Sequence, residues 1–390
     1  MDTRCADYVA TRGLAFAAIA LLLTACGGDG SKDEPAPAPF ERPGPSATPT
    51  ISWTGDLAEP QSRVVSLSVS TLITVAGLKQ VDFFIDGILS QTMTAGSPQP
   101  GVPVVVYNAP WDTSSYSDGP HTVMARVTDN ANLTAETSTR VITIENNISI
   151  PLSLSTGELF PTPASAATGS GQLAVNVATG AIGGDLLLTN MTADAVHIHS
   201  GWPTVTGPSL VDLVFDAATQ RWAVPADTHL TSVGSFAQVN DLLAGAMYID
   251  AHSTAHPDGE LRAQILLKTI SLAFGSLSGE QEVPPMSSAG RGMVSVLENR
   301  ETQSFQINAR TVGLDNVVSI GVYSKAGPAS QTNWLYFLRP DPNGNLLAGG
   351  AISTPGYNNG TWYMQVTTAQ HSSGEIGGLV PVIDHSNIAP

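Results

Sequence analysis

Three histidines near the middle of the chain have the residue types and spacing of a shared ligand set. His197 and His199 are separated by one residue, and His252 follows in a segment that also contains Asp250. On a β-strand, alternate side chains point to the same face, so both imidazoles of the His-x-His pair would project together. Neutral imidazole binds Zn and Cu, and a neighbouring carboxylate can orient its second ring nitrogen. The spacing therefore makes His197, His199 and His252 candidate metal ligands.

Three strands must bring these side chains together. Apolar residues alternate with the candidate ligands, which predicts strands around 195–199, 248–252 and 260–267. We expect the last two to form a hairpin through residues 253–259, which contain a Pro-Asp-Gly turn. Pairing with the first strand would gather the polar residues on one surface; they are His197, His199, Asp250, His252, Glu260 and Arg262.

Three interpretations of this polar surface stay open. In the first, it is a structural face on which Glu260 and Arg262 hold turns and strands together through hydrogen bonds. In the second, the three histidines bind Zn or Cu, with Asp250 or Glu260 behind them as orienting carboxylates. In the third, it is a metal-free binding surface, with Trp202 and Trp222 as platforms for a glycan or a peptide.

The chain beyond residue 149 contains an internal duplication. Residues 248–261 align without a gap on residues 363–376, and a Tyr, a His, a Gly and a Glu are shared at a constant offset of 115. Two copies follow, at 150–268 and 270–383, and each is long enough to have its own hydrophobic core. A short tail remains at 384–390.

The second copy has lost the histidines at the corresponding face. Val318 and Ile320 stand near the position expected for the His-x-His pair, and Thr367 aligns with His252. A metal site would therefore belong to the first copy only.

The motifs of the first copy resemble the chordin (CHRD) domain family. They are His-Ile-His-Ser-Gly at 197–201, a Gly-Pro turn at 207–208, and Pro-Asp-Gly-Glu-Leu-Arg-Ala-Gln at 257–264. The second copy keeps Glu-Gln-Glu-Val-Pro-Pro at 280–285 but has Gly377 in place of arginine. In animals such domains belong to an extracellular antagonist of bone morphogenetic proteins, and in bacteria to secreted or anchored proteins. The resemblance implies a β-domain in each copy and leaves the activity open.

Residues 50–148 are predicted to form a further β-sandwich. About seven short strands run through this region, and Asp86-Gly87 is a strong two-residue hairpin turn. The order of the motifs Val-Asp-Phe-Phe-Ile-Asp-Gly, Trp-Asp-Thr and Asp-Gly-Pro-His-Thr-Val resembles bacterial immunoglobulin-like modules, which implies a spacer domain. Its aspartates are interpreted as turn formers rather than calcium ligands: Asp86, Asp112, Asp118 and Asp129.

The beginning of the chain resembles a bacterial lipoprotein precursor. A basic start precedes an apolar run over 14–23, which is too short to span a bilayer but suits a signal peptide. The run ends in Leu-Thr-Ala-Cys, which resembles the lipobox. We expect residues 1–25 to be removed and Cys26 to carry the lipid, since two or three acyl chains anchor a protein stably.

The segment after the lipidated cysteine is predicted to be a flexible tether. Residues 26–49 are rich in Gly and Pro and show no period of 2 or 3.6. Gly27, rather than Asp, follows Cys26, which favours the outer membrane in enteric lineages. The expected location is thus the outer membrane, on its periplasmic or its surface face.

Composition excludes several functions. The 390 residues include 16 Lys and Arg against 33 Asp and Glu, and a net charge of −17 repels nucleic acid. The sequence has no G-x-S-x-G elbow, P-loop or H-E-x-x-H motif. We therefore expect an all-β protein of tandem β-sandwich domains, acting without catalysis as a binding or adhesion-like module for an extracellular protein or glycan. The alternative is a Zn- or Cu-binding envelope protein or metal-dependent enzyme.

Overall fold

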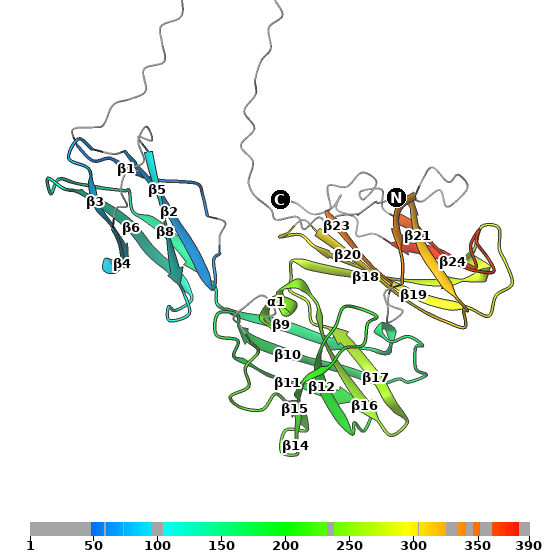
Figure 1. Cartoon of the computed structure of the whole chain (residues 1–390). Helices are drawn as coiled ribbons and strands as arrows, with labels where there is room; N and C mark the ends of the chain where they lie inside the picture. Colours follow the sequence, from blue (N-terminus) through cyan, green and yellow to red (C-terminus); the bar gives the residue numbers. More distant parts are fainter. Residues whose placement is uncertain are drawn as a thin grey trace, which may run out of the picture. The chain divides into compact units, whose positions relative to one another are not determined.

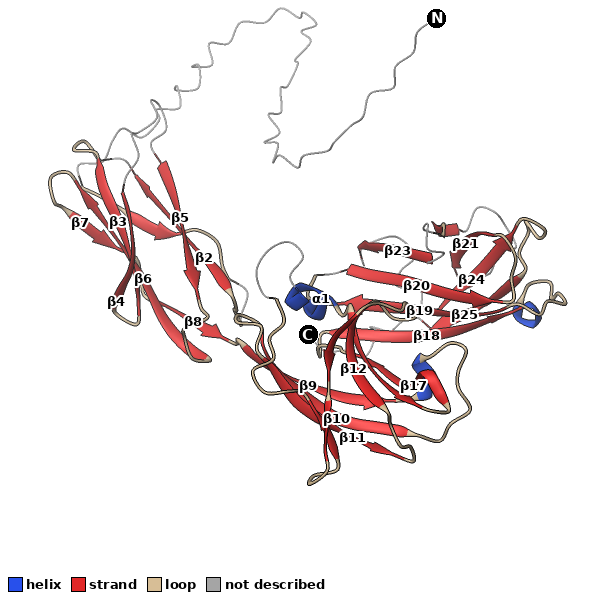
Figure 2. Cartoon of the chain, turned by 60° about the horizontal axis from the view of Figure 1, so that its bottom comes forward, coloured by secondary structure: helices blue, strands red, loops and turns tan. Residues whose placement is uncertain are grey.

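The architecture is known from a computed structural model, which describes residues 48–57, 60–72, 74–94, 104–231, 238–302, 304–324, 334–340, 346–351 and 361–381 (Figure 1). Figure 2 shows that almost all regular elements are strands. The exceptions are the helix α1 (Gln238–Ala244) and the 3-10 turns η1 (Thr156–Glu158) and η2 (Gly279–Gln281). The prediction of an all-β protein built from tandem β-sandwich domains is confirmed.

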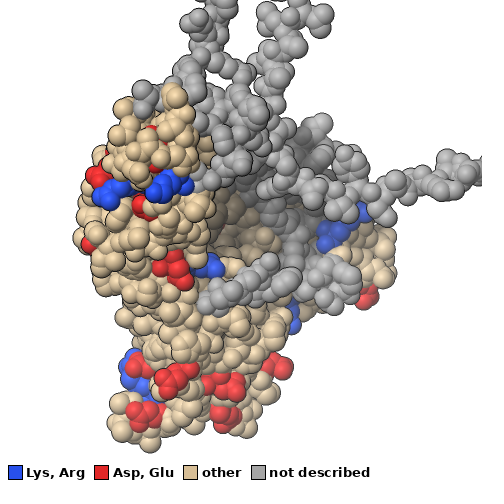
Figure 3. Space-filling model, turned by 60° about the vertical axis from the view of Figure 1, so that its left-hand side comes forward, with Lys and Arg blue, Asp and Glu red and all other residues tan. Residues whose placement is uncertain are grey.

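The described residues form three separate hydrophobic cores, one in each β-domain. Within these residues, no helix has the length and apolar character needed to cross a membrane. Figure 3 shows that uncharged side chains cover most of the described surface on the face in view, as expected when only 13% of residues are charged. The expected signal peptide, Cys26 and all but the last two residues of the expected tether lie outside the described residues.

The first β-domain consists of two sheets around one core. Its strands are β1 (Ile51–Trp53), β2 (Val64–Leu72), β3 (Leu78–Ile85), β4 (Ile88–Thr94), β5 (Val104–Asp112), β6 (Gly119–Asp129), β7 (Thr134–Glu136) and β8 (Arg140–Ile144). One sheet has the order β1-β2-β5 and the other β4-β3-β6-β7, with β8 beside β6. In β2, buried Val65, Leu67 and Val69 alternate with more exposed residues, which is the period of a half-buried strand.

The turns of this domain follow the chemistry of aspartate and glycine. Asp86 and Gly87 link β3 to β4 with positive φ angles of 49° and 77°, as a tight hairpin turn requires. Of the four aspartates interpreted as turn formers, Asp112 and Asp129 accept a hydrogen bond from the backbone N–H two residues on, as a local turn requires. Asp86 and Asp118 instead accept from the backbone N–H groups of Thr122 and Asn146, which are distant in sequence.

The second β-domain also has two sheets. Its strands are β9 (Asn147–Leu154), β10 (Thr168–Asn176), β11 (Ile182–Thr189), β12 (Ala195–Ser200), β13 (Ser209–Asp212), β14 (Val214–Asp216), β15 (Arg221–Ala223), β16 (Met247–Ser253) and β17 (His256–Gln264). The first sheet has the order β14-β15-β11-β10-β9 and the second β13-β12-β16-β17. A single bridge between Ser155 and Arg262 links the β9 end of one sheet to β17 of the other.

The hairpin between β16 and β17 differs from the predicted one. Ser253 pairs directly with His256, so Thr254 and Ala255 form the turn and the Pro-Asp-Gly segment 257–259 lies inside β17. The ladder shifts register between Ala251 and Ser253, and Gly259 has a φ of 119°. The prediction was wrong because a bulge accommodates the segment that the Pro-Asp-Gly pattern assigned to a turn.

The third β-domain repeats this arrangement. Its strands are β18 (Ile270–Ser278), β19 (Arg291–Asn299), β20 (Ser304–Val312), β21 (Val317–Ser324), β22 (Trp334–Leu338), β23 (Leu346–Ala351), β24 (Thr361–Thr368) and β25 (Ile376–Pro381). Their order is β22-β21-β24-β25-β18-β19-β20-β23. One residue pair, Ser278 with Gly377, joins β18 to β25, at the place where Ser155 meets Arg262 in the second domain.

Candidate metal centre

Strand pairing in the second domain aligns the polar side chains in neighbouring rows. In the β12–β16 ladder, His197 lies opposite Asp250 and His199 lies opposite Tyr248. The residues that alternate with them are buried in the core, Ile198 and Ile249 among them. Because side chains alternate across a strand, burying the apolar set turns the imidazoles and the carboxylate to the opposite face.

Four side chains converge at this face. Oδ1 of Asp250 lies 3.2 Å from Nε2 of His199, 3.1 Å from Nε2 of His252 and 3.8 Å from Nδ1 of His197. One ligand atom from each of the four residues lies within 4.8 Å of every other. Ligand atoms about 2.1 Å from a tetrahedral Zn are about 3.4 Å apart, so a small closure of the group would coordinate one ion.

Backbone carbonyls determine which ring nitrogens face the centre. Nδ1 of His199 lies 2.9 Å from the Gly207 carbonyl oxygen, and Nδ1 of His252 lies 2.9 Å from that of Pro257. A carbonyl oxygen only accepts hydrogen bonds, so both Nδ1 atoms carry the proton. In the neutral rings, the lone pairs of Nε2 therefore point toward Asp250, which is the arrangement of a metal-ligating histidine.

The central atoms lack hydrogen-bond partners. Nε2 of His199, Nε2 of His252 and Oδ1 of Asp250 are buried, and none forms a hydrogen bond of suitable geometry, although each nitrogen lies about 3 Å from the oxygen. If both imidazoles are neutral, the lone pairs of their Nε2 atoms face the Asp250 carboxylate, and this contact is repulsive. A cation between them, either a proton on each ring or one metal ion, removes the repulsion.

The pKa shifts at this face follow from the contact of Asp250 with two of the three histidines. Burial raises the pKa of Asp250, but contact with His199 and His252 outweighs it and lowers the pKa to about 2. Contact with Asp250 raises the pKa of His252, and it also raises that of His199 against the effect of burial. For His197, burial and the nearby His252 lower the pKa. The carboxylate thus stays ionised and attracts a cation.

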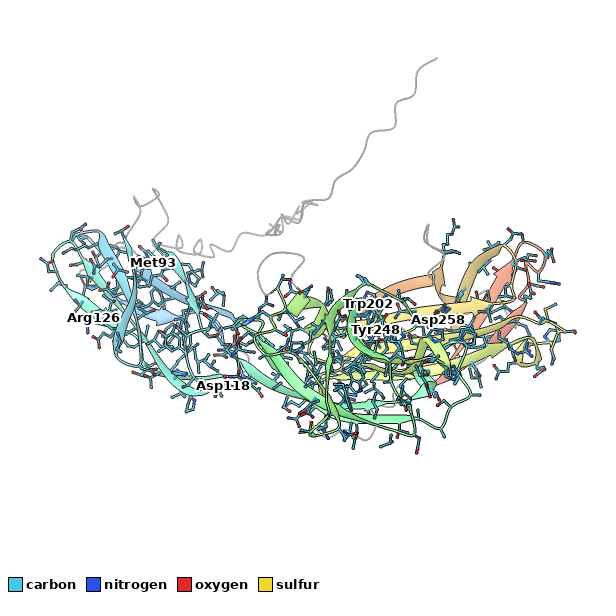
Figure 4. All side chains as sticks on the ribbon, turned by 90° about the horizontal axis from the view of Figure 1, so that it is seen from below. Met93, Asp118, Arg126, Trp202, Tyr248 and Asp258 are labelled. Atoms are coloured by element: carbon cyan, nitrogen blue, oxygen red, sulfur yellow. The ribbon has the colours of Figure 1, made fainter. Side chains whose placement is uncertain are left out.

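Arg262 and Trp202 support the cluster without joining it. The Arg262 guanidinium lies 3.5 Å from the centre of the Tyr248 ring, and the His199 ring stacks on Tyr248 at 4.8 Å with an angle of 4°. Figure 4 labels Trp202 and Tyr248, which lie close together in that view. Trp202 contributes its carbonyl oxygen, which accepts a hydrogen bond from Arg262. Trp222, the other predicted platform, is half-buried against Phe215.

Glu260 contacts the hairpin and is not part of the candidate metal centre. Its carboxylate accepts hydrogen bonds from the hydroxyls of Ser165 and Ser253. These bonds lower the pKa of Glu260 against the effect of burial. Glu260 is not among the four converging residues, whereas Asp250, expected behind the histidines, is one of them.

Sequence reasoning missed two kinds of contributor. The carbonyls of Gly207 and Pro257 orient the imidazoles, and backbone groups leave no residue-type signal. Glu158, at the end of η1, accepts a hydrogen bond from the Gln264 N–H, and burial raises the pKa of Glu158 to about 7. Only its place beneath β17, more than a hundred residues away in sequence, reveals that role.

In the third domain, the equivalent face has different residues from those predicted. The β21–β24 ladder places Gly321 opposite Gln365 and Tyr323 opposite Tyr363. The positions of His197 and His199 therefore correspond to Gly321 and Tyr323. The expectation of Val318 and Ile320 was wrong because a register shift between Val317 and Ser319 moves the pairing; Ile320 points into the core.

Comparison with known proteins identifies a family for both repeats. The CHRD domain matches residues 149–265 and residues 274–380. No curated protein matches the chain.

Three solved structures resemble parts of the chain at low identity. The central fibronectin-III array of RIM-binding protein is 12% identical, with 87% of this chain and 99% of that chain covered and a TM-score of 0.17. An uncharacterized protein from Listeria monocytogenes EGD-e is 11% identical over 84% of this chain, with a TM-score of 0.21. The cycloalternan-forming enzyme from Listeria monocytogenes is 10% identical over 83% of this chain, with a TM-score of 0.21. The chain spans 28% of each Listeria protein.

The duplicated strands, the shared motifs and the family match concern the same two regions, which together make up more than half of the chain. Apart from the additional edge strand β14 in the first region, both regions have the same strand order and the same link between sheets. The chain belongs to the CHRD domain family, with two CHRD domains in tandem.

Proposed function

We propose that the first CHRD domain binds one divalent transition-metal ion, Zn or Cu, in a protein held at the bacterial envelope. The observation that carries this proposal is a set of three buried atoms that form no hydrogen bond: Nε2 of His199 and Nε2 of His252 each lie about 3 Å from Oδ1 of Asp250. A metal ion satisfies all three at once. Imidazole suits both Zn and Cu, and a carboxylate completes a four-donor set for either.

The proposed role is binding rather than catalysis. Four protein donors fill a tetrahedral ion, whereas catalytic zinc sites keep one position open for water or substrate. The donors are His197, His199, Asp250 and His252. His197 is the most exposed imidazole of the three, so the ion would enter and leave past its ring.

A direct test is calorimetric titration of Zn and Cu into the purified protein. The double variant His197→Ala/His199→Ala should lose tight binding, since two of four donors are gone. Asp212→Asn is the matched control, because Asp212 is exposed and lies outside the converging group. Equal, weak binding by wild type and double variant would refute the metal site and leave a structural polar face.

The envelope location rests on the proposed lipoprotein signal. Cys26 would carry the lipid, residues 26–49 would act as tether, and the domain at 50–148 would be an immunoglobulin-like spacer. The sheet orders β1-β2-β5 and β4-β3-β6, with β8 beside β6, support that last assignment. A protein or glycan partner outside the cell remains a prediction.

Cys26→Ala tests the anchor. The variant should move from the membrane fraction to the soluble fraction, because Cys26 is the only cysteine of the expected mature chain. A variant that stays in washed membranes, or a mature protein without lipid mass, would contradict the anchor. The metal proposal does not depend on this result.

A further inference from the structure

The loop at residues 201–208, between β12 and β13, determines how His199 is oriented. Gly207, near its end, provides the carbonyl that accepts a hydrogen bond from Nδ1 of His199. Its N–H in turn donates to the Tyr248 hydroxyl at 3.3 Å. A side chain at position 207 would meet the Ser200 carbonyl oxygen at 1.6 Å, so only glycine fits. The position of this loop therefore controls the lone pair that His199 presents.

The same loop contains a strained residue. Thr204 has a φ of 66°, which is a genuine outlier for a β-branched side chain. Its hydroxyl is buried and has no hydrogen-bond partner. Such a conformation persists only where surrounding contacts hold it in place. The question is which contacts hold this turn.

Arg262 forms hydrogen bonds with the loop on both sides of Thr204. Its guanidinium donates hydrogen bonds to the carbonyl of Trp202 at 3.0 Å and to that of Val205 at 3.1 and 3.2 Å. The side chain of Gln264 adds a hydrogen bond to the Gly201 carbonyl at 2.7 Å. Hydrogen bonds from a charged donor are the stronger kind, and the planar fork of arginine can hold both carbonyls at once.

Arg262 also reaches His199 through an aromatic stack. The guanidinium lies over the Tyr248 ring, and the His199 ring lies parallel to that same ring. One side chain thus constrains His199 twice: through the loop to the Gly207 carbonyl, and through Tyr248 to the plane of the imidazole. Arg262 itself is buried, so its charge is committed to these contacts.

We propose that Arg262 is a positioning residue for the metal centre: by holding the strained Thr204 turn, it places the Gly207 carbonyl so that His199 presents Nε2 to the ion. Its effect on affinity rests on the proposed metal function. Its effect on the tautomer of His199 does not, because the contacts are present without metal.

The first measurement uses nuclear magnetic resonance of the metal-free, full-length protein with 15N-labelled histidine, at a pH where the rings are neutral. Wild-type His199 should carry its proton on Nδ1 alone, and Arg262→Met should give a mixture of both tautomers. His199→Gln assigns the signal. Arg221→Met is the matched control, since it removes another arginine of the same domain that bonds Asp185 and not the loop. Unchanged His199 nitrogen shifts in a folded Arg262→Met protein would overturn the proposal.

The second measurement is Zn affinity. Arg262→Met should weaken binding about 10- to 100-fold, the range seen when a group that orients a ligand is removed. Arg221→Met should leave it unchanged. Arg262→Lys keeps the charge but loses the fork, so it should weaken binding less. It also serves as the test variant if Arg262→Met does not fold, and wild-type tautomer and affinity in it would then overturn the proposal.

A rescue experiment separates positioning from general packing. Glycine adopts a φ of 66° without strain. If Arg262 acts by holding the Thr204 turn, Thr204→Gly in the Arg262→Met protein should restore part of the Nδ1–H tautomer and part of the affinity. No recovery in either would overturn the role of the turn. If wild type binds no metal, the proposed function fails while the tautomer measurement still decides the role of Arg262.

Discussion

The two CHRD domains present the same strand face with opposite chemistry. In the first, four ionisable side chains meet, and the facing atoms of three of them, His199, Asp250 and His252, form no hydrogen bond. In the second, the corresponding positions carry side chains that do not ionise at neutral pH or no side chain: Gly321, Tyr323, Gln365 and Thr367. There, the Tyr323 hydroxyl donates to the Gln365 amide oxygen at 3.4 Å, so the face is satisfied from within.

A buried carboxylate completes the network of the second CHRD domain. Glu282 accepts hydrogen bonds from the Gln365 amide at 2.9 and 3.0 Å and from the Tyr363 hydroxyl at 3.2 Å. Burial raises the pKa of Glu282 and that of Tyr363. The Tyr323 ring lies 2.7 Å from where a side chain at position 321 would begin, so it occupies that space. One backbone arrangement thus supports either the converging imidazoles and carboxylate of the first CHRD domain or the hydrogen-bonded face of the second.

The largest expected effect comes from replacing Asp250 of the first CHRD domain with glutamine, the residue at the corresponding position of the second CHRD domain. Asp250→Gln removes the only carboxylate among the converging atoms and should weaken Zn binding about 100-fold or more, by loss of a charged ligand. The pKa values of His199 and His252 should fall, because contact with Asp250 raises both. Calorimetry and histidine titration by magnetic resonance measure these changes. Unchanged affinity would show that the carboxylate is not a ligand.

The next effect concerns the stability of the second CHRD domain. Gln365→Ala removes two hydrogen bonds to the buried Glu282 carboxylate and should lower the free energy of unfolding by about 1–3 kcal/mol. Zn affinity should stay at the wild-type value, because Gln365 lies in the second CHRD domain and all four candidate ligands lie in the first. Denaturant unfolding and titration check the two outcomes. A loss of Zn affinity in this variant would show that the metal ion binds to the second CHRD domain, which would contradict the proposed site.

A smaller effect concerns Glu158, whose pKa is raised, whereas that of Asp250 in the same CHRD domain is lowered. Burial raises the pKa of Glu158 to about 7, above its ordinary 4.5, so the folded state favours the protonated form. Stability from this group is full below about pH 4.5 and is lost as pH rises through 7. Glu158→Gln keeps an acceptor for the Gln264 N–H and should raise the melting temperature at pH 8 but not at pH 4. An equal shift at both pH values would contradict the raised pKa.

The smallest effect concerns the rim of the site. Oδ1 of Asp212 lies 3.8 Å from Nε2 of His197, and its side chain is 81% exposed. Asp212→Asn should reduce Zn affinity less than about threefold, and the difference should vanish at high salt, because exposed charges interact weakly and are screened. A tenfold loss that survives high salt would make Asp212 a ligand.

Local patterns in the sequence predicted much of this comparison. The alternation of apolar and polar residues identified the strands and the shared face of His197 and His199, because side-chain direction follows from the strand period alone. The repeat and its motifs predicted two related domains of the CHRD family. The one-residue spacing of His197 and His199 therefore identified two of the four converging residues.

Pairing register and loop positions depended on the tertiary structure. A bulge near Val317 decided that Gly321 and Tyr323 replace the histidines, and a bulge near Ser253 moved the hairpin turn. A register shift of one residue exchanges the two faces of a strand, and the cost of each alternative is set by distant packing. Contacts between segments far apart in the chain place the Gly207 carbonyl beside His199 and the Arg262 guanidinium beside its loop. Such contacts also bury Glu282. Sequence periodicity determined which side chains share a face, and only the fold determined what each of them meets there.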